Sequence, residues 1–178
     1  MDLREKKTKR SIRGAFLQLR ARKPLERITV KELCALAEIS KATFYLHYQD
    51  LYDLSDRLQQ EVVRSILACI THPERFVSEH ERFVRELFDA FHAQQSLIEI
   101  LFADTQTALL PVRIERDLKE MIYRLEPALR EDVTRNILLT YQIQGGFSAY
   151  MEHRREFGAD RVRDTISRFS ALLSGGLS

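Results

Sequence analysis

Apolar residues recur at helical spacing along nearly the whole chain, and the pattern is densest between residues 29 and 48. In the first half of this stretch, four apolar or small residues follow the i, i+3, i+4, i+7 spacing of one helix face: Val30, Leu33, Cys34 and Ala37. A second short helix would bury Phe44 and Tyr48. Only Glu38 and Ile39 separate the two patterns, so the stretch predicts two short helices joined by a tight turn, the layout of a helix-turn-helix.

Each of these helices has a capping residue at its expected start. Thr29 precedes the first helix and Glu32 stands three residues later, a spacing that predicts a capping box. Ser40 occupies the equivalent place before the second helix. The second helix then leaves small, hydroxylated or cationic side chains facing outward, where a recognition helix meets base edges and phosphates: Lys41, Ala42, Thr43, Tyr45 and His47.

The remainder of the chain is also predicted to be helical. Apolar stripes at helical spacing indicate helices over about residues 3–22, 51–66, 76–91, 97–102, 109–125, 130–154 and 160–174. No stretch alternates like a β-strand, and there is no internal repeat. We therefore predict an all-α protein, in which residues 1–50 form an N-terminal three-helix helix-turn-helix DNA-binding domain. Residues 51–178 would form a C-terminal helical bundle for ligand binding and dimerisation.

Charge is distributed unevenly along the 178 residues, although the net charge is only +2. Residues 1–50 contain 12 Lys or Arg and 6 Asp or Glu, a balance of +6, which leaves −4 for residues 51–178. A basic N-terminal segment followed by a mildly acidic remainder suits a protein whose N-terminal end binds a polyanion such as double-stranded DNA. Lys6, Lys7 and Lys9 could form an arm along the phosphates or the minor groove. On composition alone, a solvated basic surface is the alternative.

The first residues are charged throughout, and no apolar run approaches the roughly 18 residues needed to span a bilayer. We therefore expect a cytoplasmic protein with no membrane partner. Cys34 and Cys69 are interpreted as small hydrophobic residues in a reducing compartment.

Residues 39–48, Ile-Ser-Lys-Ala-Thr-Phe-Tyr-Leu-His-Tyr, resemble the recognition helix of the TetR family of bacterial transcriptional regulators. The resemblance covers about residues 7–58 and implies a ligand-responsive repressor that acts as a homodimer on a near-palindromic operator. Base edges would be contacted by Lys41, Ala42 and Thr43, and phosphates by Thr29, Lys31, Ser40, Tyr45 and His47. Two positions depart from the family pattern: Glu38 replaces the usual turn Gly, and Leu51 replaces a phosphate-contacting Lys.

Two adjacent glycines, Gly145 and Gly146, lie inside the helix predicted over residues 130–154. Each costs a helix about 1 kcal/mol relative to Ala, so close approach of another helix is expected to offset them. In the TetR family the last two helices of each protomer form a four-helix bundle across the dimer axis. The resemblance therefore implies that Gly145, Gly146 and Phe169 lie at the dimer interface. The alternative is a local kink that packs within one subunit.

The C-terminal part contains more aromatic residues than a bundle of its size needs, which is typical of a pocket for a small apolar or aromatic effector. The expected lining is Phe83, Phe88, Phe91, Phe102, Tyr123 and Tyr141, with polar groups from His80, Gln142 and Gln144. Which of these would contact a ligand is left open. The alternative is an ordinary aromatic core.

Other chemistry finds little support in the sequence. Cys69, His72 and His80 lack the second ligand pair of a structural zinc site, and Glu115, Asp117 and Glu120 fit a solvated helix face. There is no phosphate-binding loop, nucleophile motif or HExxH, so we expect no cofactor, no metal and no catalytic residue. Besides the DNA-binding regulator, a helical protein-interaction bundle that does not bind DNA remains open; an outward-facing Leu46 and the loss of Lys at position 51 favour it.

Overall fold

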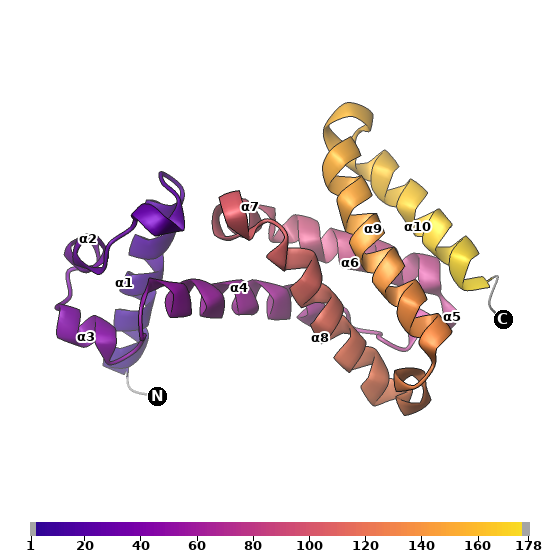
Figure 1. Ribbon diagram of the computed structural model, residues 1–178, viewed down its shortest axis with the longest axis horizontal. Coiled ribbons are helices and arrows are strands. Elements are labelled where there is room, and N and C mark those ends of the chain that lie inside the picture. Colours follow the sequence, from indigo (N-terminus) through magenta and orange to yellow (C-terminus); the bar gives the residue numbers. More distant parts are fainter. Residues whose placement is uncertain (1–2, 176–178) are drawn as a thin grey trace. The chain divides into compact units, whose positions relative to one another are not determined.

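The computed structural model describes residues 3–175, apart from the side chains of residues 77 and 78 (Figure 1). The described part contains helices and no strand, which confirms the all-α prediction. The longer helices are α1 (Leu3–Arg20), α4 (Leu51–Ala68), α6 (His80–Ala93), α8 (Leu109–Leu125), α9 (Val133–Phe157) and α10 (Ala159–Gly175). The shorter ones are η1 (Leu25–Arg27), α2 (Val30–Leu36), α3 (Lys41–Tyr45), α5 (Arg75–Ser78), α7 (Gln95–Leu101), η2 (Asp104–Gln106) and η3 (Pro127–Arg130).

The chain divides into two compact units. The first unit extends to Val62 and also includes Ser96–Thr107, whereas the second comprises Val63–Gln95 and the chain from Ala108 onward. The first unit is thus larger than the 1–50 segment predicted from the sequence. The division falls inside α4 rather than at its start.

The first unit is built around fully buried side chains from α1, α2, α3 and α4. Ile12, Phe16, Leu33, Phe44 and Leu54 are each completely inaccessible to solvent. Because these residues come from four short or amphipathic helices, none of the helices could bury its apolar face alone. The predicted stripe of α1 and the inner residue of α3 therefore meet in one core.

The segment 96–107 is held within the first unit by polar contacts. The buried Gln59 side chain on α4 donates to the backbone carbonyl of Leu101 at 2.8 Å. Arg20, at the end of α1, donates to Asp104 at 3.3 Å and to the carbonyl of Lys23 at 3.1 Å. The Arg20 side chain is almost completely buried, whereas Asp104 is 51% exposed. This pair therefore leaves a buried cation with one half-exposed counter-charge.

The second unit is a bundle in which α9 packs against both α8 and α10, and α10 also packs against α6 (Figure 1). Its core includes Phe83, Leu118, Ile122, Leu129 and Leu139. Gly158, at φ +84°, ends α9 in a conformation that favours glycine and begins the turn into α10.

Two local predictions were wrong. The single helix expected over residues 76–91 is interrupted at Glu79, whose backbone (φ −135°, ψ 55°) is not helical. The Lys6, Lys7 and Lys9 segment is not an arm, because α1 already begins at Leu3. Within that helix Lys9 pairs with Glu5 one turn earlier at 2.8 Å, which supports helical rather than extended backbone there.

Candidate functional site

The start of α2 has the capping box that its sequence predicts. The Thr29 hydroxyl accepts from the backbone N–H of Glu32 at 3.2 Å. The pKa of Glu32 is lowered, mainly by the hydrogen bond from the Lys23 ammonium at 2.6 Å and further by the backbone N–H of Thr29. The carboxylate is therefore ionised and joins the start of α2 to Lys23.

The turn after α2 has the two hydrogen bonds of a Schellman motif. The backbone N–H of Ile39 donates to the carbonyl of Cys34 at 3.0 Å, and that of Glu38 donates to Ala35 at 3.4 Å. Glu38 occupies the position of this motif where Gly is usual, and its φ is +55°. The sequence departure at Glu38 therefore places an L side chain in the left-handed region.

The short helix α3 is capped by Ser40, as predicted. The Ser40 hydroxyl accepts from the backbone N–H of Thr43 at 3.0 Å, and the hydroxyl oxygens of the two residues lie 2.8 Å apart. Phe44 and Tyr48 face the core, where their rings lie 5.8 Å apart. The cap at one end and the two buried rings at the other fix which side chains of α3 face solvent.

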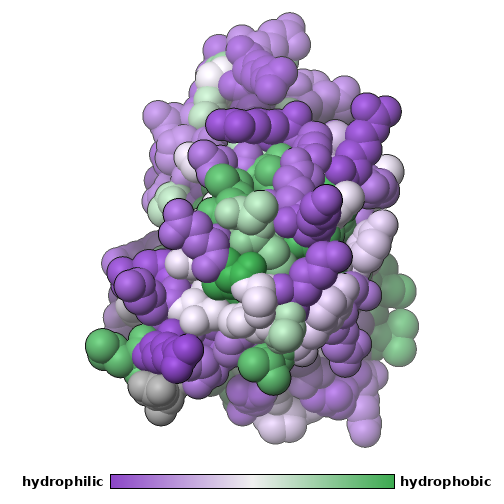
Figure 2. All heavy atoms as spheres, turned by 90° about the vertical axis from the view of Figure 1, so that its left-hand side faces the viewer, coloured by the Kyte–Doolittle hydropathy of each residue, from purple (hydrophilic) through white to green (hydrophobic). Residues whose placement is uncertain are grey.

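The predicted contact residues lie on α2, on α3 and immediately beside them. Thr29, Lys31, Ser40, Lys41, Ala42 and Tyr45 are exposed, and Thr43 and His47 are partly exposed. Figure 2 views the molecule from the side on which α2 and α3 lie in Figure 1, and most of the surface seen there is hydrophilic around a smaller apolar area. Leu46 is also exposed, to 81%. Every one of the eight predicted residues is therefore accessible to a ligand.

Leu51 belongs to the core of the first unit, since only 7% of its surface is exposed. The Asp50 carboxylate caps α4 by accepting from the backbone N–H of Asp53 at 2.8 Å. The side chain of residue 51 is therefore directed into the protein, away from any surface ligand. One cation nearby is Arg57, which pairs with Asp53 at 2.8 Å and lies 5.3 Å from the centre of the Tyr48 ring.

Both α9 and α10 carry exposed apolar side chains, which we call together the apolar stripe. On α9 the stripe consists of Val133, Ile137 and Tyr141, one turn apart, with Tyr141 69% exposed. On α10 it comprises Phe169, Leu172 and Leu173, with Phe169 61% exposed. Large apolar residues at regular spacing on a surface are typical of an interface.

The two glycines of α9 differ in their surroundings. A Cβ atom on Gly145 would meet nothing within 4 Å, whereas one on Gly146 would lie 3.3 Å from Cγ2 of Ile166 on α10. Gly146 therefore permits close packing of α9 on α10 within one chain. Gly145 is exposed, one turn beyond Tyr141 on the apolar stripe.

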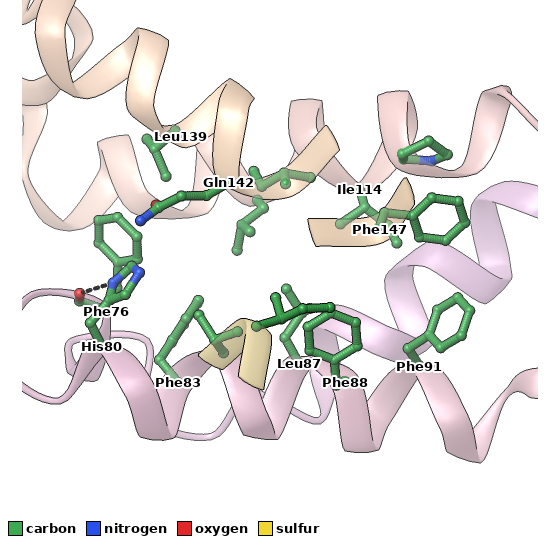
Figure 3. Close-up of a pocket in the computed structure, with 15 residues that line it drawn as sticks. Phe76, His80, Phe83, Leu87, Phe88, Phe91, Ile114, Leu139, Gln142 and Phe147 are labelled. Carbon is green, nitrogen blue, oxygen red and sulfur yellow. Dashed lines mark hydrogen bonds between the residues drawn. The ribbon is translucent and has the colours of Figure 1, made fainter. Parts of the chain in front are cut away.

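The second unit contains a cavity of about 60 Å³ between α6, α8, α9 and α10 (Figure 3). Figure 3 shows side chains of α6, among them Phe83, Leu87 and Phe88, facing those of α8 and α9 across this space. Most of the lining is apolar. The volume holds a few water molecules and is far below the roughly 300–1,000 Å³ of a typical ligand pocket, so a larger ligand would have to open it.

His80 and Gln142 supply the polar lining of the cavity. Nδ1 of His80 lies 3.0 Å from the carbonyl oxygen of Phe76, and Nε2 lies 3.0 Å from the Ser170 hydroxyl. A carbonyl can only accept, so Nδ1 carries the proton and Nε2 accepts from Ser170 in the neutral ring. Burial lowers the pKa of His80, which favours this neutral form. Gln142 donates to the Ser170 carbonyl at 2.9 Å and to the Ser174 hydroxyl at 3.0 Å.

The sequence predicted part of this lining. Phe83, Phe88, Phe91, His80 and Gln142 line the cavity. The other four expected residues do not line it. Tyr141 is exposed on the apolar stripe, and Phe102 is buried in the first unit. The Tyr123 hydroxyl is hydrogen-bonded to Asn136, and Gln144 donates to Glu115 at 2.7 Å. Phe76, Phe147 and Ile166 line the cavity and were missed.

Within residues 3–175, no cluster of three or more His, Cys, Asp or Glu side chains is arranged to hold a metal ion. His72 instead bonds Glu74 at 2.9 Å. None of the described helices combines the length and the apolar character needed to cross a bilayer. In comparisons with known proteins, neither a protein-family model nor a curated protein matches the chain.

Proposed function

We propose that the chain is a sequence-specific DNA-binding regulator of transcription that works as a homodimer. The observation that carries the proposal is the α2–turn–α3 pair, whose caps and buried rings leave small, hydroxylated and cationic side chains exposed on a basic N-terminal segment. This combination fits the helix-turn-helix geometry, in which the second helix enters the major groove. The resemblance to the TetR family favours repression as the direction of control.

In this proposal α3 is the recognition helix. Lys41, Ala42 and Thr43 approach base edges, while phosphates are contacted by Thr29, Lys31, Ser40, Tyr45 and His47. The two sets have different roles, because base contacts determine sequence preference and phosphate contacts determine position and overall affinity. Tyr45→Phe should therefore weaken binding to specific and random DNA alike. Thr43→Ala should reduce the preference for the specific sequence by about 1–3 kcal/mol if one base contact is lost.

Dimerisation through α9 and α10 completes the proposed unit. A five-residue recognition helix reads too few base pairs for selectivity, so two half-sites are needed, about 34–36 Å apart on a near-palindromic operator. The apolar stripe on α9 and α10 supplies a surface that a second copy would cover. We place Gly145 and Phe169 in this interface, and Gly146 beside them as the residue that lets α9 and α10 pack closely.

A small apolar or aromatic effector is proposed to regulate DNA binding from the cavity in the second unit. The aromatic lining and the neutral His80 suit an uncharged ligand. A coupling of about 1–3 kcal/mol would change operator affinity by roughly 5–150-fold, and DNA must weaken effector binding by the same factor. Calorimetry with an effector found by thermal-shift screening, run with and without operator, tests this reciprocity. Equal affinities in the two titrations would show that the cavity does not control DNA binding.

The main test first selects duplex DNA from a random pool with the purified protein. The selected duplex is then the ligand in the binding measurements. Fluorescence anisotropy with the selected and a scrambled duplex, at several salt concentrations, should show tighter binding to the selected sequence. The logarithm of the binding constant should fall linearly with that of the salt concentration. Lys41→Gln should weaken binding, whereas Arg124→Gln, which removes an exposed charge on α8, should not.

A protein-interaction bundle without DNA binding is the second candidate, favoured by the exposed Leu46 and the buried Leu51. Leu46 places an apolar side chain on the proposed DNA-binding face. Leu51 stands where the TetR family has a phosphate-contacting Lys, so that cation is missing from the face. Under this candidate, wild-type protein shows no anisotropy change with either duplex even at low salt. That result would overturn the proposed function.

A further inference from the structure

The exposed surface of α3 has an unusual set of side chains for a helix that would read DNA. The sequence of α3, Lys-Ala-Thr-Phe-Tyr, contains no Arg, Asn, Gln, Asp or Glu. The common side-chain pairings in the major groove are Arg or Lys with guanine, Asn or Gln with adenine, and Glu or Asp with cytosine; of these, α3 offers only Lys41 for guanine. If α3 lies in that groove, sequence preference must therefore come mainly from other chemistry.

Thr43 uses part of its hydrogen-bonding capacity within its own helix. Its hydroxyl lies 2.8 Å from that of Ser40, and its backbone N–H donates to the same Ser40 oxygen at 3.0 Å. Both interactions belong to the cap of α3. The Thr43 hydroxyl keeps two of its three hydrogen-bonding positions, and the methyl group beside it takes no part in the cap, so it can offer an apolar contact to a ligand.

Two further apolar side chains are exposed within three residues of Thr43. Ala42 and Leu46 are one helical turn apart, because the backbone N–H of Leu46 donates to the carbonyl of Ala42 at 3.1 Å. Both are exposed, and Leu46 exposes 81% of its surface. Together with Thr43 they form what we call the methyl strip: Ala42, Thr43 and Leu46.

We propose that the methyl strip reads the C5-methyl groups of thymines in the major groove, so that each half-site carries thymines under Ala42, Thr43 and Leu46. Thymine is the only DNA base that presents a methyl group there, and apolar side chains are its usual partners. Lys41, exposed at the start of α3, supplies the positive charge beside the strip and can contact guanine O6 and N7. Covering Leu46 with thymine methyl groups would also remove an apolar side chain from water. This inference rests on the proposed DNA binding and specifies its chemistry.

Deoxyuridine is the direct probe, because it lacks only the methyl group of thymidine and pairs with adenine in the same way. The selected operator is resynthesised with deoxyuridine at one thymine position at a time, in both half-sites, and binding is measured by anisotropy. Each lost methyl contact should weaken binding about fourfold, and a symmetric pair of substitutions about 15-fold. Substitution at thymines outside the contacted positions serves as the internal control.

Protein variants assign the effect to named side chains. Thr43→Ser keeps the hydroxyl that binds Ser40 and removes the methyl group, so it should abolish discrimination at one thymine position. Thr43→Val keeps a methyl group and removes the hydroxyl, so discrimination there should persist. Leu46→Ala should abolish discrimination at a different thymine, and Thr134→Ser, at an exposed position on α9, should change nothing.

Two outcomes would overturn the inference, and they differ in what they say about the protein. If wild-type protein binds its selected operator but tolerates deoxyuridine everywhere, thymine methyl groups are not read, although the proposed DNA binding stands. If no duplex is bound even at low salt, the proposed function fails and the inference fails with it.

Discussion

The left-handed backbone at Glu38 gives a stability prediction that does not depend on any ligand. Glu38 is exposed at φ +55°, and the two hydrogen bonds of its turn are made by backbone atoms. A non-glycine residue in this region loses about 1–2 kcal/mol, whereas glycine adds about 0.4–1 kcal/mol of conformational freedom to the unfolded chain. Glu38→Gly should therefore raise the free energy of unfolding by a net of about 0.5–1 kcal/mol.

Glu38→Ala is the matched control, since it removes the same carboxylate but keeps the Cβ atom. Urea unfolding followed by circular dichroism compares the two variants. Because the chain has two compact units, hydrogen exchange at the Ile39 amide, which donates to Cys34, should show whether the gain lies in the first unit. If Glu38→Gly and Glu38→Ala unfold at the same urea concentration, the Cβ atom carries no strain and the reasoning is refuted.

Three other predictions concern the remaining features. Phe169→Glu should give monomers in sedimentation and abolish specific DNA binding. The control Leu125→Glu, at an exposed position outside the apolar stripe, should leave the dimer intact. A Phe169→Glu protein that is still dimeric would refute the proposed interface. Asp104→Asn should lower the free energy of unfolding in urea by about 1–2 kcal/mol, because it removes the carboxylate that pairs with the buried Arg20. Asn, like Asp, tolerates the φ of +56° at this position. Unchanged stability would show that the ion pair contributes nothing. Burial lowers the pKa of His80, so the unfolded chain binds a proton more readily than the folded one, and the free energy of unfolding should fall as pH drops below about 6.5. His80→Gln should reduce that pH dependence and His92→Gln, exposed on the same helix, should not; equal curves for His80→Gln and wild type would contradict the assignment.

Local signals in the sequence were sufficient for the α2–turn–α3 region. Thr29, Ser40 and Asp50 each cap the helix that follows, because capping depends only on a side-chain oxygen and backbone groups two or three residues away. The tight turn at Glu38 was predicted on the same grounds. Such interactions are complete within a few residues, so they can be predicted without knowledge of the tertiary structure.

The break between α5 and α6 has no comparable signal, since neither Gly nor Pro occurs there. In a continuous helix the carbonyl of Phe76 would accept from the backbone N–H of His80. Here the His80 ring nitrogen lies 3.0 Å from that carbonyl instead. A side chain therefore replaces the backbone donor, and this exchange depends on the packing that holds the ring in place.

Helical periodicity also could not distinguish a core face from an exposed apolar face. Val133, Ile137 and Tyr141 share one side of α9, as their spacing indicates, but α8 and α10 cover other sides of that helix. Tyr141 was consequently expected in the cavity and lies on the surface. Periodicity identifies the residues that share a face, whereas the neighbour of that face is set by the arrangement of the whole bundle.

The connectivity of the two units bears on how a ligand in the cavity could influence DNA binding. The chain passes between the units at Val62–Val63, at Gln95–Ser96 and at Thr107–Ala108. The first passage lies in α4. The other two passages mark the ends of segment 96–107, whose contacts with the rest of the first unit include those of Gln59 and Arg20. In the chain, this segment follows α6 and precedes α8. Both of these helices line the cavity, so we propose that displacement of either helix by a ligand is passed along the chain to segment 96–107, in addition to any effect through α4.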